Sequence, residues 1–337
     1  MGGFLLLLTI THPAPTVVQM KDFWQKLPKP FFVLAPLEDV TDAAFRRLIA
    51  RHGKPAVMFT EFTSADGLIL APESGQTKLR KKLLFSEEER PIVAQLFSAS
   101  PERMEKAAAL CRETGFDGID INMGCPDRAV EKGQCGAAMI KNPALAKEII
   151  RAVKRGAQEL PVSVKTRIGY AENELNTWLP ILLEEGPAVI TIHARTRNEM
   201  SEVPAHWEAV TQAVAIRDAM SSKTLIVGNG DAKNLNDARA KAKTSGCDGV
   251  MLGRAIYGNP WLFVDRAEPP TPQERINALC EHLEFFNELL GGVVNYATMK
   301  KHFKAYISGW DDAKGLRLQL METASVDEAL LVLKQHR

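Results

Sequence analysis

The sequence predicts an α/β fold, a (β/α)8 TIM barrel followed by a small all-α helical domain. Short apolar segments alternate with amphipathic segments from residue 31 to residue 255. Continuous apolar strands separated by helices are typical of a parallel sheet whose outer face is covered. After residue 271 the chain contains helical patterns only, which indicates a separate helical domain.

The strand-like segments are short and rich in Val and Ile, which distinguishes them from buried helices. They occupy residues 31–36, 56–62, 91–97, 118–124, 161–168, 188–195, 224–230 and 249–255. Doubly wound open sheets usually have fewer strands than this, so a closed barrel is the better prediction. No GxGxxG motif follows any of these segments, which argues against a dinucleotide-binding Rossmann sheet.

The helical segments between the strands carry recognisable first and last residues. The sequence Ser-Pro-Glu at 100–102 predicts the start of a helix that ends at Gly115. Asn-Pro at 142–143 predicts the start of the next helix. Asn-Asp at 236–237 predicts the cap of a later helix that ends at Gly246.

The chain divides into three parts. Residues 1–29 are expected to form a poorly ordered N-terminal extension, with the sequence HPAP at 12–15 as a helix breaker. Residues 30–265 form the barrel. The pattern changes after the Glu-Pro-Pro sequence that ends at residue 270, and residues 271–337 form the helical domain.

The composition is that of an ordinary soluble enzyme. The 337 residues include 42 Lys and Arg and 41 Asp and Glu, so the chain has no overall positive charge that would indicate a nucleic-acid partner. A local basic stripe could still bind one. The five cysteines form no CxxC pair, which favours a reducing, cytoplasmic environment. The apolar run at 4–10 lacks a basic flank and is too short to span a bilayer, so neither a secretory signal nor a membrane partner is expected.

Polar side chains follow the predicted strands at the points where the strands end. They are Gln95, Asn122, Cys125, Lys165, Arg167, His193, Arg195, Asn229, Asp231 and Arg254. A strand buried on both faces avoids such side chains unless they have partners. In a barrel of this kind the active site lies at the carboxyl ends of the strands, so this pattern predicts a site there.

Single members of this set also have plainer interpretations. Lys165 and Arg167 lie two residues apart and share one face of their strand, but two solvated cations are an alternative. His193 alone is more often a core histidine than a ligand, and the sequence GNGD at 228–231 is also a common turn and helix cap. The Gly-Arg pair at 253–254 fits a phosphate site, because barrels often bind phosphate after their last two strands.

Cys125, in the sequence NMGCP, is the sharpest candidate. It follows a strand directly and precedes a proline, which predicts an exposed loop position facing the site. A thiol there is suited to act as a nucleophile or a proton donor, and a buried inert thiol is the alternative. No His or Cys lies at metal-ligand spacing from it, so we expect no metal. Cys135 is a nearby competitor that follows no strand.

Several motifs occur together in this order. They are APLEDVTD from Ala35, AQLF from Ala94, DGIDINMGCP from Asp117, GAAMI from Gly136, VKTRIG from Val164, TIHARTR from Thr191, GNGD from Gly228 and DGVMLGRA from Asp248. On these motifs the chain resembles the tRNA-dihydrouridine synthases over residues 30–310. The chain departs from the usual family pattern at Leu37, where methionine is common, and at Glu38 and Asp39, where small residues are common.

The resemblance implies an FMN-binding barrel at 30–265 and a tRNA-binding helical domain at 271–337. It implies that NADPH, or alternatively NADH, reduces FMN, and that FMN then reduces the C5–C6 double bond of uridine in tRNA to 5,6-dihydrouridine. The implied macromolecular partner is tRNA, with no obligate protein partner. The implied location is the cytoplasm.

The resemblance also implies roles for individual residues. Cys125 is the catalytic residue and protonates C5 of the uracil. The implied cofactor-binding residues are Ala35, Pro36, Leu37, Gln95, Lys165, His193, Asn229, Gly230, Asp231, Gly253 and Arg254. The implied substrate-binding residues are Asn122, Arg167 and Arg195.

Three other functions remain as alternatives. The first is a flavin barrel acting on a free pyrimidine, similar to dihydroorotate dehydrogenase, although a free base needs no second binding domain. The second is an aldolase-like barrel with Lys165 as a Schiff base, which would be colourless. The third is a non-catalytic RNA-binding module, which would not need a thiol at a strand end.

Two basic clusters are candidate contacts for the RNA backbone. One is the set Lys78, Arg80, Lys81 and Lys82. The other is the set Lys300, Lys301 and Lys304, with Tyr296 and His302 beside it. Lys300 and Lys304 are four residues apart and share a helix face, but a solvated surface helix has the same pattern.

Overall fold

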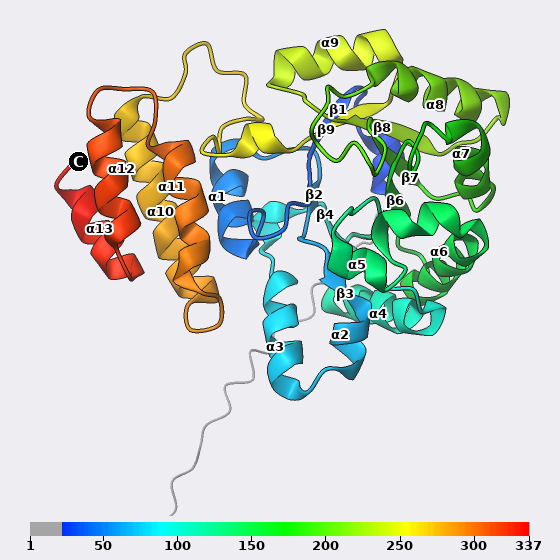
Figure 1. Cartoon of the computed structure of the whole chain (residues 1–337), viewed down its shortest axis with the longest axis horizontal. Coiled ribbons are helices and arrows are strands. Elements are labelled where there is room, and N and C mark those ends of the chain that lie inside the picture. Colours follow the sequence, from blue (N-terminus) through cyan, green and yellow to red (C-terminus); the bar gives the residue numbers. More distant parts are fainter. Residues whose placement is uncertain (1–21, 337) are drawn as a thin grey trace, which may run out of the picture.

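A closed barrel of parallel strands forms the centre of the protein, of which the computed structural model describes residues 22–336 (Figure 1). The strands are β1 (Phe31–Leu34), β2 (Met58–Phe59), β3 (Thr63–Ser64), β4 (Ile92–Phe97), β5 (Gly118–Met123), β6 (Val162–Arg167), β7 (Val189–His193), β8 (Leu225–Asn229) and β9 (Gly249–Leu252). They pair in the order β1-β9-β8-β7-β6-β5-β4-β2, and β3 also pairs with β4. A parallel bridge between Val33 and Val57 joins the two ends of this order, so the predicted barrel is confirmed.

The second predicted strand, 56–62, is interrupted. It forms two short strands, β2 and β3, which pair with successive parts of β4. Between them the hydroxyl of Thr60 accepts a hydrogen bond from the backbone N–H of Gln95 at 3.1 Å, in place of a backbone carbonyl. The side chain of Thr60 therefore interrupts the regular ladder at this point.

Helices cover the outer face of the barrel, and shorter helices are inserted at its carboxyl-terminal rim (Figure 1). The outer helices are α1 (Ala43–Gly53), α4 (Pro101–Thr114), α6 (Pro143–Ala157), α7 (Leu175–Glu184), α8 (Trp207–Ala219) and α9 (Leu235–Ser245). The inserted elements are α2 (Ala65–Leu70), α3 (Glu73–Lys82), α5 (Arg128–Lys132), η3 (Gly136–Lys141) and η4 (Arg254–Ile256). The short helix η2 (Glu87–Glu89) instead directly precedes β4, on the amino-terminal side of that strand.

Most of the predicted helix ends are observed. Ser100 caps α4, which ends at Gly115 with a positive φ of 93°, a conformation that glycine adopts without strain. Asn142 caps α6. The predicted cap of α9 at 236–237 was two residues late, because Asn234 is the residue whose side chain accepts from the backbone N–H of Asp237.

The amino-terminal end of the barrel is closed by η1 (Phe23–Lys26). Phe23 and Trp24 are buried there, and the ring of Trp24 lies 5.8 Å from that of Phe31 and 6.1 Å from that of Phe59. The segment 1–29, expected to be a poorly ordered extension, therefore includes residues that pack into the barrel. Its first part, residues 1–21, including the apolar run at 4–10, lies outside the described residues.

The carboxyl-terminal segment is helical, as predicted. It contains α10 (Pro272–Leu290), η5 (Tyr296–Met299), α11 (Lys300–Tyr306), α12 (Ala313–Glu322) and α13 (Val326–Lys334). Helix α10 packs against α1, where Phe45 stacks on His282 at 4.9 Å and Arg47 lies 3.1 Å from Glu288. Among the helices between residues 22 and 336, none has both the length and the apolar character needed to cross a membrane.

Candidate active site

A cavity of about 310 Å³ opens at the carboxyl ends of the barrel strands. Every residue that the sequence analysis assigned to the site contributes to its lining. These residues are Ala35, Pro36, Leu37, Gln95, Asn122, Cys125, Lys165, Arg167, His193, Arg195, Asn229, Gly230, Asp231, Gly253 and Arg254. Because parallel strands in a barrel end at the same rim, residues far apart in the chain meet there.

Other lining residues were not found from the sequence. They include Phe62, Gly124, Ser201, Met251 and Tyr257. Met251 lies inside an apolar strand and Ser201 in an irregular loop, so neither carries a pattern that distinguishes it. Tyr257 could have been suspected from the sequence, because it closely follows the Gly-Arg pair at 253–254, the candidate phosphate site.

Cys125 is partly buried at the cavity wall, in the loop that follows β5. Its backbone N–H donates to Oδ1 of Asn122 at 2.9 Å, and its carbonyl accepts from the N–H of Ala137 at 3.0 Å. Burial raises the pKa of the Cys125 thiol above its ordinary value. The thiol is therefore protonated at neutral pH, which suits a proton donor rather than an activated nucleophile.

Cys135, the competing thiol, does not line this cavity. It is buried, and its Sγ lies 3.1 Å from the carbonyl oxygen of Gly133. Burial raises its pKa to about 11. Of the two thiols, Cys125 is the one that reaches the cavity.

Lys165 extends from β6 into the cavity and makes no hydrogen bond or ion pair to any residue from 22 to 336. Burial, together with the neighbouring guanidinium of Arg167, lowers the pKa of Lys165 to about 8. The ammonium group is still charged at neutral pH. Asp120 acts on Lys165 through its charge, but no described carboxylate forms a direct ion pair with the ammonium group. A cation that lines a cavity without a direct protein partner is prepared to meet an anionic or strongly polar group of a ligand.

The two arginines assigned to substrate binding are instead extensively bonded to the protein. Arg167 donates from Nε to the carbonyl of Gly124 at 2.8 Å, and from Nη1 to the carbonyls of Thr196 at 2.8 Å and Met200 at 2.9 Å. It thereby ties the loop of Cys125 to the loop after β7. Its Nη2 remains outside these bonds.

Arg195 is bonded within the loop after β7 and across to the loop after β8. Its Nε donates to the carbonyl of Val203 at 2.6 Å, and its Nη2 forms an ion pair with Asp231. Its Nη1 lies 3.2 Å from Nε2 of His193. Burial, followed by the surrounding cations, holds the pKa of His193 well below its ordinary value, so this imidazole is neutral.

The loops after β8 and β9 meet at Asp231. One carboxylate oxygen of Asp231 accepts from the N–H of Ala205 at 2.9 Å, and the other pairs with Arg254. Gly230 adopts a φ of 135°, and a Cβ at this position would lie 2.7 Å from that of Ala205, so only glycine fits. The side chain of Arg254 is 61% exposed and borders the cavity.

These observations fit a flavin mononucleotide. Lys165 offers a positive charge that the protein leaves unpaired. The amide of Gln95 is bonded to Asp120 and Asn122, and its second N–H and second lone pair remain for a pyrimidine-like edge. Arg254 with the glycine loops after β8 and β9 offers a site for a phosphate. Lys165 and Gln95 therefore suit the polar isoalloxazine ring of FMN, and Arg254 with the glycine loops suits its phosphate group.

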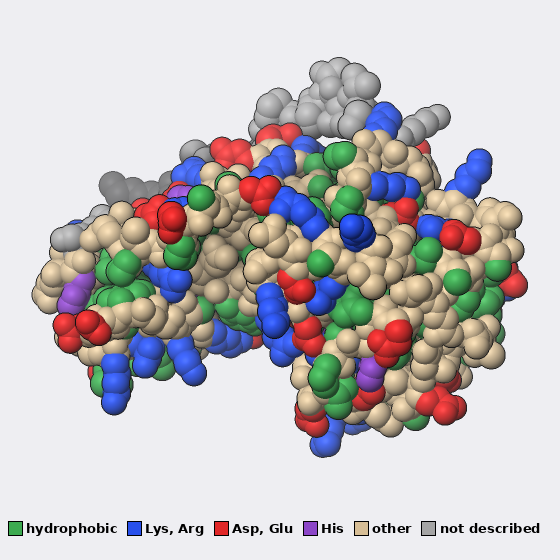
Figure 2. Space-filling model, turned by 90° about the horizontal axis from the view of Figure 1, so that it is seen from above, with side chains coloured by type: hydrophobic (Ala, Val, Ile, Leu, Met, Phe, Trp, Pro, Cys, Tyr) green, Lys and Arg blue, Asp and Glu red, His purple; other side chains and the backbone are tan. Residues whose placement is uncertain are grey.

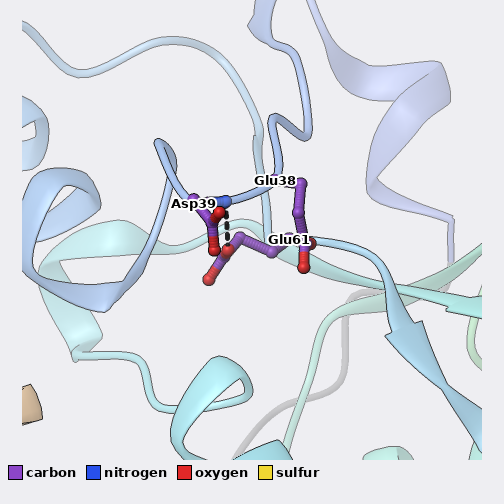
Figure 3. A group of neighbouring side chains, drawn as sticks. All are labelled: Glu38, Asp39 and Glu61. Carbon is purple, nitrogen blue, oxygen red and sulfur yellow. Dashed lines mark hydrogen bonds between the residues drawn. The ribbon is translucent and has the colours of Figure 1, made fainter. Parts of the chain in front are cut away.

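The carboxylates of Glu38, Asp39 and Glu61 lie close together (Figure 3), and Glu38 also lines the cavity. The N–H of Asp39 donates to Oε1 of Glu61 at 2.7 Å, and burial raises the pKa of Glu61 to about 7. Lys82 pairs with Glu38, and Lys301 lies 2.7 Å from Asp39. The departures from the family pattern at Glu38 and Asp39 therefore accompany ion pairs to α3 and to the helical domain.

Comparison with known proteins agrees with the fold. The solved structure of histamine dehydrogenase from Rhizobium sp. 4-9 superposes with a TM-score of 0.51 at 15% identity, over 75% of this chain and 48% of that one. The barrel, its lysine and thiol, and the flavin-compatible cavity define an enzyme of the flavin-dependent oxidoreductase class. Residues 33–336 match the dihydrouridine synthase (Dus) family.

Relatives of similar length carry the same family name. A probable tRNA-dihydrouridine synthase of Staphylococcus aureus (strain COL) is 41% identical over 94% of this chain and 95% of its own length. A probable tRNA-dihydrouridine synthase 2 of Bacillus subtilis (strain 168) is 40% identical over 93% of this chain and 96% of its own length. The chain belongs to the dihydrouridine synthase family.

Proposed function

We propose that this protein reduces uridine in tRNA to 5,6-dihydrouridine, with FMN as cofactor and NADPH as reductant. The observation that carries the proposal is the meeting of two groups in one cavity. The thiol of Cys125 is kept protonated by burial, and the ammonium of Lys165 forms no hydrogen bond or direct ion pair with the described residues. A proton donor beside an unpaired cation is what the reduction of an activated carbon–carbon double bond requires.

FMN, when bound and reduced, supplies the hydride that C6 of the uracil receives. The residues proposed to hold FMN are Ala35, Pro36, Leu37, Gln95, Lys165, His193, Asn229, Gly230, Asp231, Gly253 and Arg254. Lys165 offsets negative charge on the isoalloxazine ring, and Arg254 contacts the phosphate. Neutral His193 acts as a hydrogen-bonding group, because its low pKa keeps a further positive charge out of the cavity.

Cys125 gives its proton to C5, where negative charge develops after hydride addition at C6. The thiolate left behind takes a proton from solvent, and the next uridine meets a thiol again. Asn122 and the free Nη2 of Arg167 are proposed to orient the uracil. Arg195 serves this substrate site indirectly, because its own bonds hold the loops after β7 and β8 together.

The tRNA is proposed to contact both the barrel and the helical domain at 271–337. Figure 2 shows Lys and Arg side chains along the hollow between these two parts. Four of the candidate lysines are engaged within the protein, because Lys81 and Lys300 donate to backbone carbonyls, and Lys82 and Lys301 pair with carboxylates. A second set is exposed and makes no hydrogen bond or ion pair to residues 22–336: Lys78, Arg80 and Lys304.

This second set is the better candidate for phosphate contacts. A uridine stacked in folded tRNA must be flipped out to reach the cavity, at a cost of a few kcal/mol, which contacts to the RNA backbone offset. Such a substrate places the reaction in the cytoplasm.

The experiment that tests the function uses the purified protein and unmodified tRNA. A visible flavin spectrum is expected, together with 5,6-dihydrouridine in the nucleosides of tRNA incubated with protein and NADPH. A parallel reaction with NADH measures the preference for reductant. A colourless protein would favour an aldolase-like enzyme, and a flavoprotein that reduces only free pyrimidines would favour the dihydroorotate dehydrogenase alternative.

A further inference from the structure

A line of buried hydrogen bonds runs from the barrel interior to the loop of Cys125. The amide nitrogen of Gln95 donates to Oδ2 of Asp120 at 2.7 Å, and the amide nitrogen of Asn122 donates to Oε1 of Gln95 at 3.1 Å. Oδ1 of Asn122 in turn accepts from the backbone N–H of Gly124 at 3.1 Å and of Cys125 at 2.9 Å. Asp120 is fully buried and is not part of the cavity lining.

The direction of every bond in this line is fixed from both ends. A backbone N–H can only donate, so Asn122 must turn its oxygen to Cys125 and its nitrogen to Gln95. Gln95 must then turn its oxygen to Asn122 and its nitrogen to Asp120. An ionised carboxylate can only accept, and Asp120 is the acceptor that completes the line.

The carboxylate of Asp120 is an expensive group for this position. Its direct partners are the hydroxyl of Ser163 at 2.5 Å and the amide of Gln95, and neither is a cation. Burial raises the pKa of Asp120 to about 6, against the opposing effects of these bonds and of Lys165. An apolar or amide side chain would avoid the cost of burying a charge, so stability alone does not explain the carboxylate.

The sequence carried a signal for this residue. Asp120 and Asn122 lie two positions apart on β5, and their side chains therefore share the face of the strand that looks into the barrel. Their paired positions on β6 are Ser163 and Lys165. Asp120 and Ser163 thus form one polar pair inside the barrel, and Asn122 and Lys165 form a second pair nearer the carboxyl ends of the strands. Of these two pairs, the second lines the cavity.

We propose that Asp120 is a positioning residue for the proposed reaction, which orients Gln95 and Asn122 and thereby sets the place of Cys125 relative to the uracil. The inference rests on the proposed function for its consequence in catalysis. Its structural part, the control of the Cys125 loop by Asp120, stands independently. Asp120 lies outside the cavity lining, so it acts only through Gln95 and Asn122.

The test replaces Asp120 with leucine, which has a similar size and no acceptor oxygen. Asparagine would not serve, because its Oδ1 could still accept from Gln95 while its Nδ2 donates to the hydroxyl of Ser163. In Asp120→Leu the amide nitrogen of Gln95 loses its partner, so the orientation of Gln95, and with it that of Asn122, is no longer fixed. We expect kcat for tRNA reduction, measured with FMN at saturating concentration, to fall about 10²-fold, the usual effect of a misplacement near 1 Å. KM for tRNA should not change.

A second readout does not depend on catalysis. The rate of alkylation of Cys125 by iodoacetamide, followed by mass spectrometry of the Cys125 peptide, should change in Asp120→Leu. Ser163→Ala is the matched control, because it removes a bond to the other oxygen of the same carboxylate and leaves the line to Cys125 intact. We expect alkylation and kcat in Ser163→Ala to match those of the native protein.

Gln95→Met interrupts the same line at its middle and keeps the test valid if Asp120→Leu does not fold. It should alter alkylation of Cys125, and adding Asp120→Leu to it should have no further effect on that rate. Native alkylation rates in both single variants would overturn the proposal. If the native protein makes no dihydrouridine, the proposed function fails, but the alkylation rates still decide whether Asp120 controls the loop.

Discussion

Lys165 and Arg167 lie two positions apart on β6 and line the same cavity, but only Arg167 is bonded to the protein. The guanidinium of Arg167 donates hydrogen bonds to the backbone carbonyls of Gly124, Thr196 and Met200, and so fixes the walls of the site. Lys165 makes no hydrogen bond or direct ion pair to residues 22–336. Arg167 therefore holds the cavity walls in place, whereas Lys165 is available to interact with a bound ligand.

The first prediction follows for Lys165. Replacement by methionine keeps the length of the side chain and removes the charge that offsets the reduced flavin. We expect a more negative flavin reduction potential and a hydride transfer from NADPH slower by about 10²–10³-fold, as for loss of a group that stabilises developing charge. Lys147→Met, on the exposed side of α6, is the control. An unchanged potential in Lys165→Met would contradict this role.

The second prediction concerns Arg254 and the phosphate of FMN. Arg254→Ala should weaken FMN binding by about 1.5 kcal/mol, the lower end of the range for a hydrogen bond to a charged group, because the side chain is largely exposed. Riboflavin lacks the phosphate, so its affinity should be the same in the native and variant proteins. Equilibrium titration with both flavins measures the difference, and equal losses for both would refute the phosphate contact.

The third prediction concerns the stability of the protein against pH. Burial raises the pKa of Glu61 to about 7 in the folded chain, above its ordinary value of 4.5. Between these values the folded state binds more protons than the unfolded state, so this group makes the free energy of unfolding fall as pH rises. In Glu61→Gln the fall should be shallower. Urea unfolding at several pH values across this window measures the slope, and an identical slope in the variant would show that Glu61 does not titrate as described.

The fourth prediction concerns RNA binding by the helical domain. Reversing the charges of Lys300, Lys301 and Lys304 to Glu should raise KM for tRNA and flatten the salt dependence of binding, because fewer counter-ions are released. Lys304→Glu alone should account for much of this change, since Lys300 and Lys301 are bonded within the protein.

The control for the fourth prediction is Lys314→Glu, a reversal at an exposed lysine of α12. FMN content and NADPH oxidation should be unchanged in all of these variants. If the triple charge reversal leaves the affinity for tRNA unchanged, another surface of the protein binds the RNA.

Much of the fold and of the cavity lining could be predicted from the sequence, for a physical reason. Strand order in a barrel follows chain order, so residues at strand ends, such as Gln95 and Asn229, must meet at one rim. The unpaired state of Lys165 and the bonding of Arg167 could not be predicted. They depend on where the loops after β5 and β7 place their carbonyl groups.

Other features depended on packing that has no local pattern. Phe23 and Trp24 were assigned to an extension, because nothing in their own segment reveals the open barrel end that they fill. Phe62 and Tyr257 reach the cavity from irregular segments. Asp120 did carry a local signal, two residues before Asn122, but its position within an apolar strand concealed it.

The proton transfer from Cys125 is tested by measuring the two half-reactions of the enzyme separately. In Cys125→Ala, the rate of flavin reduction by NADPH should be that of the native protein, because the thiol takes no part in it. Oxidation of the reduced protein by tRNA, followed anaerobically by flavin absorbance, should slow by about 10²–10⁴-fold, the usual contribution of general acid catalysis. Cys135→Ala should leave both rates unchanged. Equal losses of both half-reactions in Cys125→Ala, or a native rate of tRNA reduction, would contradict the assignment of Cys125 as the proton donor.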